Sequence, residues 1–296
     1  MNICLIDADS KIPNLALMKI SAWHKAQGDQ VSWYNAMFHV KENKPDKIYA
    51  SKVFTFTEDY HYFPHDVEVV KGGTGYDIKK TLPDEIETIC PDYSLYDMDH
   101  SLGFLTRGCP NKCSWCFVPK KEGNIRPAQD IEEFLRHDKA ILADNNVLAH
   151  DWGIKQIEKI IKLKVKVDFN QGLDARLIND STAKLLSKVR WLNPIRLACD
   201  TEGQMKHVQK AVELLRWYNA TPARYSCYVL LKPGKIDDCL KRVKFLKGIC
   251  IDPFVQPFQP PKGRIIPQDE KDLARYCDMK ATFKSVWWED YKKTGA

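Results

Sequence analysis

The chain has 296 residues, of which 44% are hydrophobic and 28% are charged, and its formal net charge is +6. These values fit one large or two modest globular domains and exclude a highly charged disordered chain. No apolar run approaches the roughly 20 residues of a membrane span, and Asp7 and Asp9 interrupt the apolar start, so we expect neither a membrane segment nor a signal peptide. Ten cysteines in a chain of this size then favour a reducing cytoplasm over a disulfide framework.

The sequence of residues 1–98 predicts a small α/β domain. A helix is expected at 13–27, between the first two of four strands, and the helix between the second and third strands should be short or missing. The first, second and fourth strands are expected at 2–8, 31–36 and 67–70, and the stretch 47–57 contains the third. Strands that alternate with helices favour a parallel sheet. The glycine-rich stretch 71–77 (KGGTGYD) follows the fourth strand and indicates a tight turn or, less strongly, a phosphate site.

Residues 99–296 predict a second domain, which a proline-containing acidic linker at 82–100 joins to the first. Six strands alternate with five helices and are followed by one long helix at 269–291. The strands are expected at 102–105, 140–143, 165–169, 195–199, 225–231 and 249–257, and the helices at 127–137, 154–163, 181–188, 204–218 and 236–246. This succession fits a partial (β/α)6 barrel, in which function gathers at the carboxyl ends of the strands.

Three cysteines lie just past the first barrel strand. Cys109, Cys113 and Cys116 have the spacing C-x3-C-x2-C on a loop that Gly108 and Pro110 keep irregular. Three thiolates so close in sequence can face one point only if a metal or a cluster occupies it. A structural zinc site needs four ligands, whereas an iron–sulfur cluster held by three cysteines leaves one iron open to a substrate.

Aromatic residues flank the last cysteine, Trp115 before it and Phe117 after it. With them, the motif resembles the signature of the radical S-adenosylmethionine (SAM) superfamily, and TRGCPNKCSWC is similar to members with a cobalamin-binding domain in front. The resemblance implies that the three cysteines hold a [4Fe-4S] cluster and that SAM binds its open iron. Reduction would then cleave SAM to a 5′-deoxyadenosyl radical, which abstracts hydrogen from a substrate. An electron donor such as flavodoxin or ferredoxin is implied as well.

Polar residues at strand ends complete the expected cofactor site. Asp144 follows the second barrel strand, where the superfamily often has a Gly-Gly-Glu motif that this chain lacks, and helix capping competes with an ammonium contact. Arg176 suits a carboxylate, although an ion pair with Asp174 competes, and Asp200 suits a ribose or a helix cap. The expected cofactor-binding residues are Phe117, Asp144, Asn145, Asn170, Gln171, Arg176 and Asp200.

The substrate is a small molecule, a peptide or a nucleic acid, and no motif distinguishes these. Residues 1–98 resemble a trimmed, degenerate Rossmann-like domain of the cobalamin-binding kind. The cobalt-ligating motif Asp-x-His-x-x-Gly of such domains is missing, which argues against cobalamin and leaves methyl transfer without a visible carrier. In the tRNA-methylthiolating enzymes that the motif resembles, three additional amino-terminal cysteines bind a second cluster. The amino-terminal region of this chain offers only Cys4 and Cys90. The competing function is a non-catalytic protein with zinc on the three cysteines and nucleic acid on its mildly basic surface.

Overall fold

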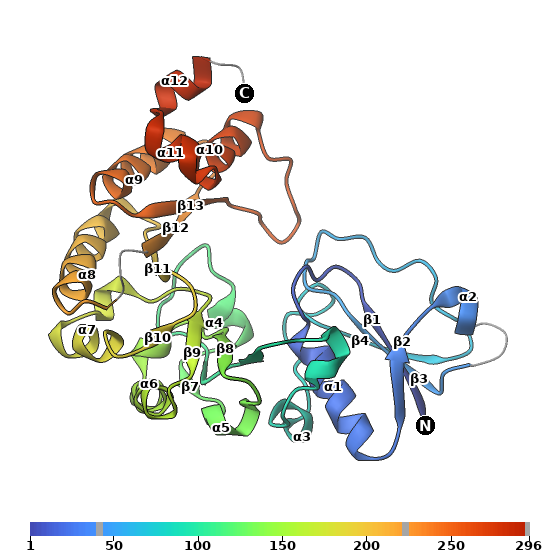
Figure 1. Cartoon of the computed structure of the whole chain (residues 1–296). Coiled ribbons are helices and arrows are strands. Elements are labelled where there is room, and N and C mark those ends of the chain that lie inside the picture. Colours follow the sequence, from blue (N-terminus) through green and yellow to red (C-terminus); the bar gives the residue numbers. More distant parts are fainter. Residues whose placement is uncertain (40–43, 221–224, 294–296) are drawn as a thin grey trace.

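The computed structural model describes residues 1–39, 44–220 and 225–293. Figure 1 shows an amino-terminal α/β part, drawn in blue, beside a larger part that runs from green to red. In the described part of the chain, no helix has both the length and the apolar character that a membrane crossing needs. Each of the two parts is built on parallel strands, which is the fold class that the sequence predicts.

The amino-terminal sheet has the strand order β2-β1-β3-β4, and every pair is parallel. Helix α1 (Leu15–Ala26) connects β1 to β2, and α2 (Ala36–His39) is the short helix expected before β3. The strands are β1 (Asn2–Asp7), β2 (Gln30–Trp33), β3 (Lys47–Ser51) and β4 (Glu68–Gly72). β3 lies within the predicted stretch 47–57 and ends at Ser51. Beyond it, the Asp9 carboxylate accepts the N–H groups of Val53 and Phe54 and turns the chain away from the sheet.

All six barrel strands that the sequence predicts are present, in chain order. They are β5 (Ser101–Gly103), β8 (Lys139–Leu142), β9 (Lys166–Phe169), β11 (Ile195–Ala198), β12 (Tyr225–Leu231) and β13 (Asp252–Pro257). The first three form one parallel sheet together with β10 (Arg190–Trp191), and the last three form another. The two sheets meet where Leu173 donates its N–H to the Arg196 carbonyl at 2.7 Å. The strands therefore form a partial barrel.

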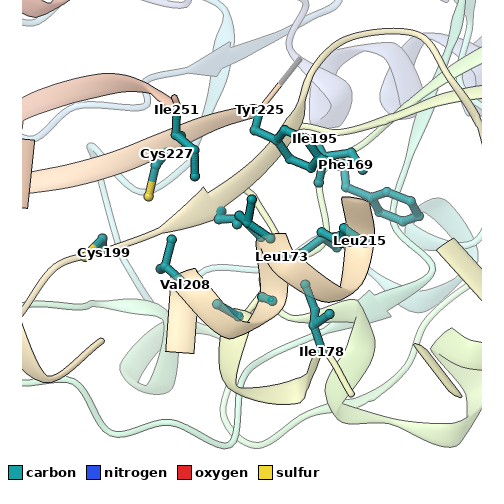
Figure 2. Close-up of a cluster of buried hydrophobic side chains, with 14 of the residues drawn as sticks. Phe169, Leu173, Ile178, Ile195, Cys199, Val208, Leu215, Tyr225, Cys227 and Ile251 are labelled. Atoms are coloured by element: carbon teal, nitrogen blue, oxygen red, sulfur yellow. The ribbon is translucent and has the colours of Figure 1, made fainter. Parts of the chain in front are cut away.

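Helices cover the outer face of this barrel and enclose its core. They are α6 (Asp151–Leu163), α7 (Asp180–Leu186), α8 (Met205–Trp217) and α9 (Ile236–Gly248). Figure 2 shows Val208 and Leu215 of α8 among side chains from the strands, such as Ile195 of β11 and Cys227 of β12. The apolar residues of α8 recur at helical spacing, so one face of the helix is buried against the sheet.

Two of the predicted helices are wrong in extent. In place of 127–137 there is only α5 (Ile131–Phe134), because β7 (Arg126–Pro127) pairs with β6 (Thr106–Arg107) and Asp130 then caps the helix. The tail is not one helix but three, namely α10 (Gln268–Asp278), α11 (Lys280–Ser285) and α12 (Trp288–Lys293). The remaining short elements are the helices α3 (Asp84–Glu87) and α4 (Val118–Lys121) and the 3-10 turns at 93–96, 147–149, 175–177 and 202–204.

The two parts of the molecule contact each other near the first barrel strand and near the last one. On the β5 side, the Tyr93 hydroxyl accepts the Leu102 N–H at 3.2 Å and donates to the Phe134 carbonyl at 2.7 Å. On the β13 side, the Thr55 hydroxyl donates to the carbonyl of Pro261. The amino-terminal part therefore borders the first barrel strand and also the loop after the last one.

Gly153, in the first turn of α6, offers a direct test of this packing. A β-carbon there would lie 2.1 Å from the Val147 carbonyl oxygen, so Gly153→Ala forces the backbone apart. We expect it to lower the free energy of unfolding by about 1–3 kcal/mol, the usual cost of overpacking. Thermal denaturation followed by circular dichroism measures the change. Gly248→Ala is the matched control, since nothing lies within 4 Å of its added β-carbon. Equal melting temperatures for the two variants would contradict this packing.

Candidate functional site

The cysteine loop begins where the β6–β7 pair ends, at the carboxyl end of the barrel strands. Gly108 opens it with a φ of +80°, and a β-carbon there would lie 2.3 Å from the Asn124 carbonyl oxygen. Its N–H donates to a Glu122 carboxylate oxygen at 2.8 Å, and the next N–H, that of Cys109, donates to the Gly123 carbonyl at 3.2 Å. The start of the loop is therefore fixed by backbone geometry that only glycine tolerates.

The three cysteines of the loop are free and partly buried. Burial raises the pKa of the Cys113 and Cys116 thiols, and the charges of neighbouring thiolates raise both further. Among the described residues, no group of three or more cysteine, histidine or acidic side chains converges on one point that would suit a single metal ion. In a [4Fe-4S] cluster each cysteine binds its own iron, so its ligands surround a volume and need not share a point. Three soft sulfur donors on one loop fit such a cluster.

Asp174 connects the cysteine loop to the ends of two strands. Its carboxylate accepts from Asn111 of the cysteine loop at 3.1 Å and from Asn146, which follows β8, at 3.2 Å. It also forms a two-point ion pair with Arg176, with N–O distances of 2.8 and 2.7 Å. Burial opposes ionisation of Asp174, but the bonds from Arg176 and Asn111 hold its pKa below the ordinary value. One ionised carboxylate thus joins three loops that are far apart in sequence.

Asn146 is buried directly beside a cysteine. Its side-chain nitrogen lies 3.7 Å from the Cys109 sulfur and 3.2 Å from Asp174, and the residue is 3% exposed. Its Oδ1 atom is buried and has no hydrogen-bond partner among the described residues. An unpaired buried oxygen costs about 1–3 kcal/mol. This acceptor, next to the cysteines, suits a ligand that carries an N–H or O–H group.

Arg176 makes the ion pair with Asp174 that competes with its predicted role as a carboxylate ligand. Its side chain is 38% exposed, and its charge partly offsets the rise that burial causes in the pKa of Cys113. Asp174 engages Nε and Nη2, which leaves Nη1 for a second partner. The ion pair therefore orients the guanidinium without using all of its donors.

For Asp144, both expected roles disagree with its position. The residue is 3% exposed, and its two carboxylate oxygens accept the N–H groups of Leu105 and Thr106 and the Thr106 hydroxyl. Burial raises the pKa of Asp144 to about 6 despite these bonds. Helix α6 is capped by His150 instead. Asp144 lies beneath the chain that leads into the cysteine loop, where it holds that chain in place, and it has no open face for a ligand.

Asp200 lies just past the end of β11, near enough to the cysteines for its charge to act on them. One of its oxygens accepts the Leu230 N–H at 3.1 Å, burial raises its pKa, and its charge raises the pKa of Cys113 and Cys116. The competing capping role is wrong, because Thr201 caps the turn that precedes α8. Asp200 thus keeps one oxygen for a ligand at the edge of the site.

The other predicted residues lie around the loop with different exposures. Asn145 donates to Glu122 at 2.9 Å and so supports the loop from the side of β8. Asn170 is half-buried, and its carbonyl accepts from the Tyr228 hydroxyl at 2.7 Å. Gln171 is exposed, and Phe117 is 50% exposed at the start of α4. The position of Phe117 on the surface leaves its ring available to a partner or a substrate.

Sequence reasoning missed the contacts made by three residues. Asn111 and Asn146 both bond to Asp174, and Lys232, just after β12, lies 4.2 Å above the Trp115 ring. Asn146 belongs to the polar run after the second barrel strand, and that position was a usable signal. Nothing in the local sequence marks Asn111 or Lys232, since both act through contacts with distant loops.

The chain is similar to a curated relative in sequence and to solved structures in fold. No family model matches the chain. A curated relative, the tRNA-2-methylthio-N(6)-dimethylallyladenosine synthase of Sulfurihydrogenibium sp. (strain YO3AOP1), is 24% identical over 241 residues, which are 70% of this chain and 54% of the relative. The cobalamin-dependent S-adenosylmethionine radical enzyme OxsB, with aqua-cobalamin and S-adenosylmethionine bound, superposes with a TM-score of 0.55 at 12% identity. The chain resembles the radical SAM superfamily in sequence and in fold.

The likeness to OxsB covers 96% of this chain and 56% of OxsB. A second OxsB structure, with aqua-cobalamin bound, gives a TM-score of 0.56 at 13% identity. The resemblance, expected from the cysteine motif, and the partial barrel, expected from the succession of strands and helices, are confirmed. The chain spans about half the length of the relatives that it matches, namely 54% of the tRNA-2-methylthio-N(6)-dimethylallyladenosine synthase and 56% of OxsB.

Proposed function

We propose that this chain is a radical SAM enzyme in which Cys109, Cys113 and Cys116 hold a [4Fe-4S] cluster. When bound, the cluster supplies the electron that cleaves SAM to a 5′-deoxyadenosyl radical, which abstracts hydrogen from a substrate. The observation that carries the proposal is the position of the C-x3-C-x2-C loop. It lies at the carboxyl end of parallel barrel strands, and Asp174 ties it to the ends of β8 and β9.

The side chains around the loop match the polar groups of SAM in kind. Arg176 keeps guanidinium donors free for the SAM carboxylate, and the buried Oδ1 of Asn146 accepts from its amino group. Asp200 keeps one oxygen for a ribose hydroxyl. In this proposal Asn146 takes the part that the sequence prediction gave to Asp144, because both follow β8 and only Asn146 has an acceptor without a partner among the described residues.

Anaerobic reconstitution tests the proposed function. The purified protein is incubated with iron and sulfide, its metal content is measured, and SAM is added with dithionite. We expect about four irons and four sulfides for each chain, as a [4Fe-4S] cluster requires, and formation of 5′-deoxyadenosine. A protein that holds one zinc and no iron, and that leaves SAM intact, would overturn the proposal in favour of a zinc-stapled nucleic-acid-binding protein.

For the reaction that follows radical formation, we propose hydrogen abstraction without methylthiolation. Cys4 is fully buried in the amino-terminal sheet and Cys90 lies in the segment before residues 93–96, so this pair offers no place for a second cluster. We further propose that residues 1–98 form one domain and residues 99–296 another. The first domain borders the cysteine loop of the second and does not bind cobalamin. In support, Lys121 of α4, just after the cysteine loop, donates to the Thr74 hydroxyl of the glycine-rich turn.

The partners and the setting are proposals too. The electron comes from a flavodoxin or a ferredoxin, and the substrate is a small molecule, a peptide or a nucleic acid. A reducing cytoplasm suits a cluster that must accept an electron, and all ten cysteines of the chain are free thiols in the structure.

A further inference from the structure

The amide of Asn146 points its nitrogen at a cluster ligand. The nitrogen carries two hydrogens, and its two neighbours are acceptors, the Cys109 sulfur at 3.7 Å and the Asp174 carboxylate at 3.2 Å. One hydrogen therefore faces each acceptor. Both contacts lie in a buried place, since Asn146 is 3% exposed, and there a hydrogen bond is electrostatically stronger than in water.

Rotation of the Asn146 side-chain amide by 180° would be energetically unfavourable. A flipped Asn146 would set its oxygen against a thiolate and a carboxylate, which are two acceptors, and this arrangement repels. The present orientation is kept although it leaves Oδ1 without a partner among the described residues. Hydrogen bonds from Arg176 and Asn111 keep Asp174 ionised, so its carboxylate always acts as a hydrogen-bond acceptor toward Asn146. The direction of the N–H toward Cys109 is thus fixed by the surrounding charges.

We infer that Asn146 raises the reduction potential of the cluster held by Cys109, Cys113 and Cys116, an inference that rests on the proposed function. Reduction adds one electron from the donor to the cluster, and the extra negative charge spreads onto the cysteine sulfurs. An N–H that points at a sulfur stabilises this charge, so the reduced state becomes easier to reach. Asn146 is a positioning residue in this role, because it acts on the cluster through Cys109.

The ion pair beside Asn146 also acts on the cysteines, since the charge of Arg176 reaches Cys113. Two short contacts join Asp174 to Arg176, and neither contact involves Asn146 or Asn111. The ion pair is therefore common to the wild type and to variants at these two asparagines, whereas the amide N–H beside the Cys109 sulfur belongs to Asn146. The inference therefore predicts that the donated hydrogen matters, and that the number of bonds to Asp174 does not.

Two variants separate these effects, because each loses one bond to Asp174 and only one of them loses the donor to sulfur. Asn146→Leu keeps the size of the side chain and removes the N–H, whereas Asn111→Ala leaves the contact with Cys109 intact. Wild type and variants are reconstituted anaerobically without SAM, and the reduced cluster is titrated against potential by electron paramagnetic resonance. We expect a more negative midpoint for Asn146→Leu and an unchanged midpoint for Asn111→Ala.

Several outcomes would overturn the inference. An unchanged midpoint in Asn146→Leu would show that the N–H does not reach the cluster, and an equal shift in Asn111→Ala would show that anchoring of the loop is responsible. If leucine prevents assembly of the cluster, Asn146→Ala serves for the same comparison. Failure of the wild type to take up iron would overturn the proposed function itself, which distinguishes the two failures.

Discussion

Replacing any one of Cys109, Cys113 and Cys116 by alanine is expected to abolish iron uptake and SAM cleavage together. Three ligands are the fewest that hold a four-iron cluster with one iron open, so a chain with two cannot keep it. Changes beside a metal ligand typically cost about 10- to 100-fold in affinity or activity, and loss of a ligand should exceed this range. Iron analysis and the rate of 5′-deoxyadenosine formation measure the effect after anaerobic reconstitution.

Cys250→Ala is the control for this experiment. Its thiol is exposed and lies outside the site, so iron content and SAM cleavage should equal those of the wild type. The three cysteine variants should also melt like the wild-type protein without metal, because their thiols lie on a loop and are only partly buried. A variant that retained the cluster would show that the lost thiol is not a ligand and would require a different set.

Arg242→Met should produce the largest loss of stability. Arg242 is fully buried and donates to the carbonyls of Cys199 and Leu230 at 2.9–3.1 Å, so it joins the ends of β11 and β12 from beneath. Methionine fills the space but leaves two buried carbonyls without a donor, at a cost of about 1–3 kcal/mol each. We expect a loss of about 3 kcal/mol and a melting temperature lower by roughly 10 °C. Thermal denaturation measures both values.

The neighbouring position provides the comparison for Arg242. Lys241 is 65% exposed and pairs with Glu202 on the surface at 3.1 Å. Lys241→Met should change the free energy of unfolding by no more than about 0.5 kcal/mol, as is usual at exposed sites. The same melting temperature for Arg242→Met and the wild type would mean that the buried carbonyls find other donors. Because Asp200 follows Cys199 and accepts from the Leu230 N–H, disorder at these strand ends should also weaken SAM binding.

The order of the barrel strands was predictable because each buried strand carries its own apolar signal. β12 (YSCYVLL) alternates buried and half-buried residues, and α8 repeats apolar residues at the spacing of one helical face. Such patterns are local, so they survive without knowledge of the neighbours. The cysteine spacing is local in the same sense. For this reason the cysteine loop could be found before its surroundings were known.

The ends of several elements depend on contacts that no local pattern reveals. The tail stops being helical near Val286, whose carbonyl accepts from the Tyr276 hydroxyl and from Lys247 of α9. The short α5 did carry a signal, because Asp130 and Glu133 form a capping box that begins the helix at Ile131. Capping chemistry at this point indicates the helix start more precisely than the apolar pattern does.

The network around Asp174 could not be predicted from the sequence. Its partners Asn111 and Asn146 lie 63 and 28 residues away, and they meet it only because strands β8 and β9 are neighbours in the sheet. The position of the Asp144 side chain could not be predicted for a related reason, because a carboxylate that follows a strand can point into the site or beneath it. Its direction is decided by the backbone N–H groups of Leu105 and Thr106, which come from a different strand end.

The hydroxyl of Tyr93 has a consequence for the solubility of the protein. β5 is the outermost strand of its sheet, and an exposed strand edge invites pairing with a strand of another molecule. Tyr93 occupies the N–H of Leu102 in the middle of that edge and packs in one apolar cluster with Leu102 and Met18 of α1. A second molecule that approached this edge would therefore find the Leu102 N–H already bonded, which should disfavour intermolecular β-sheet at β5.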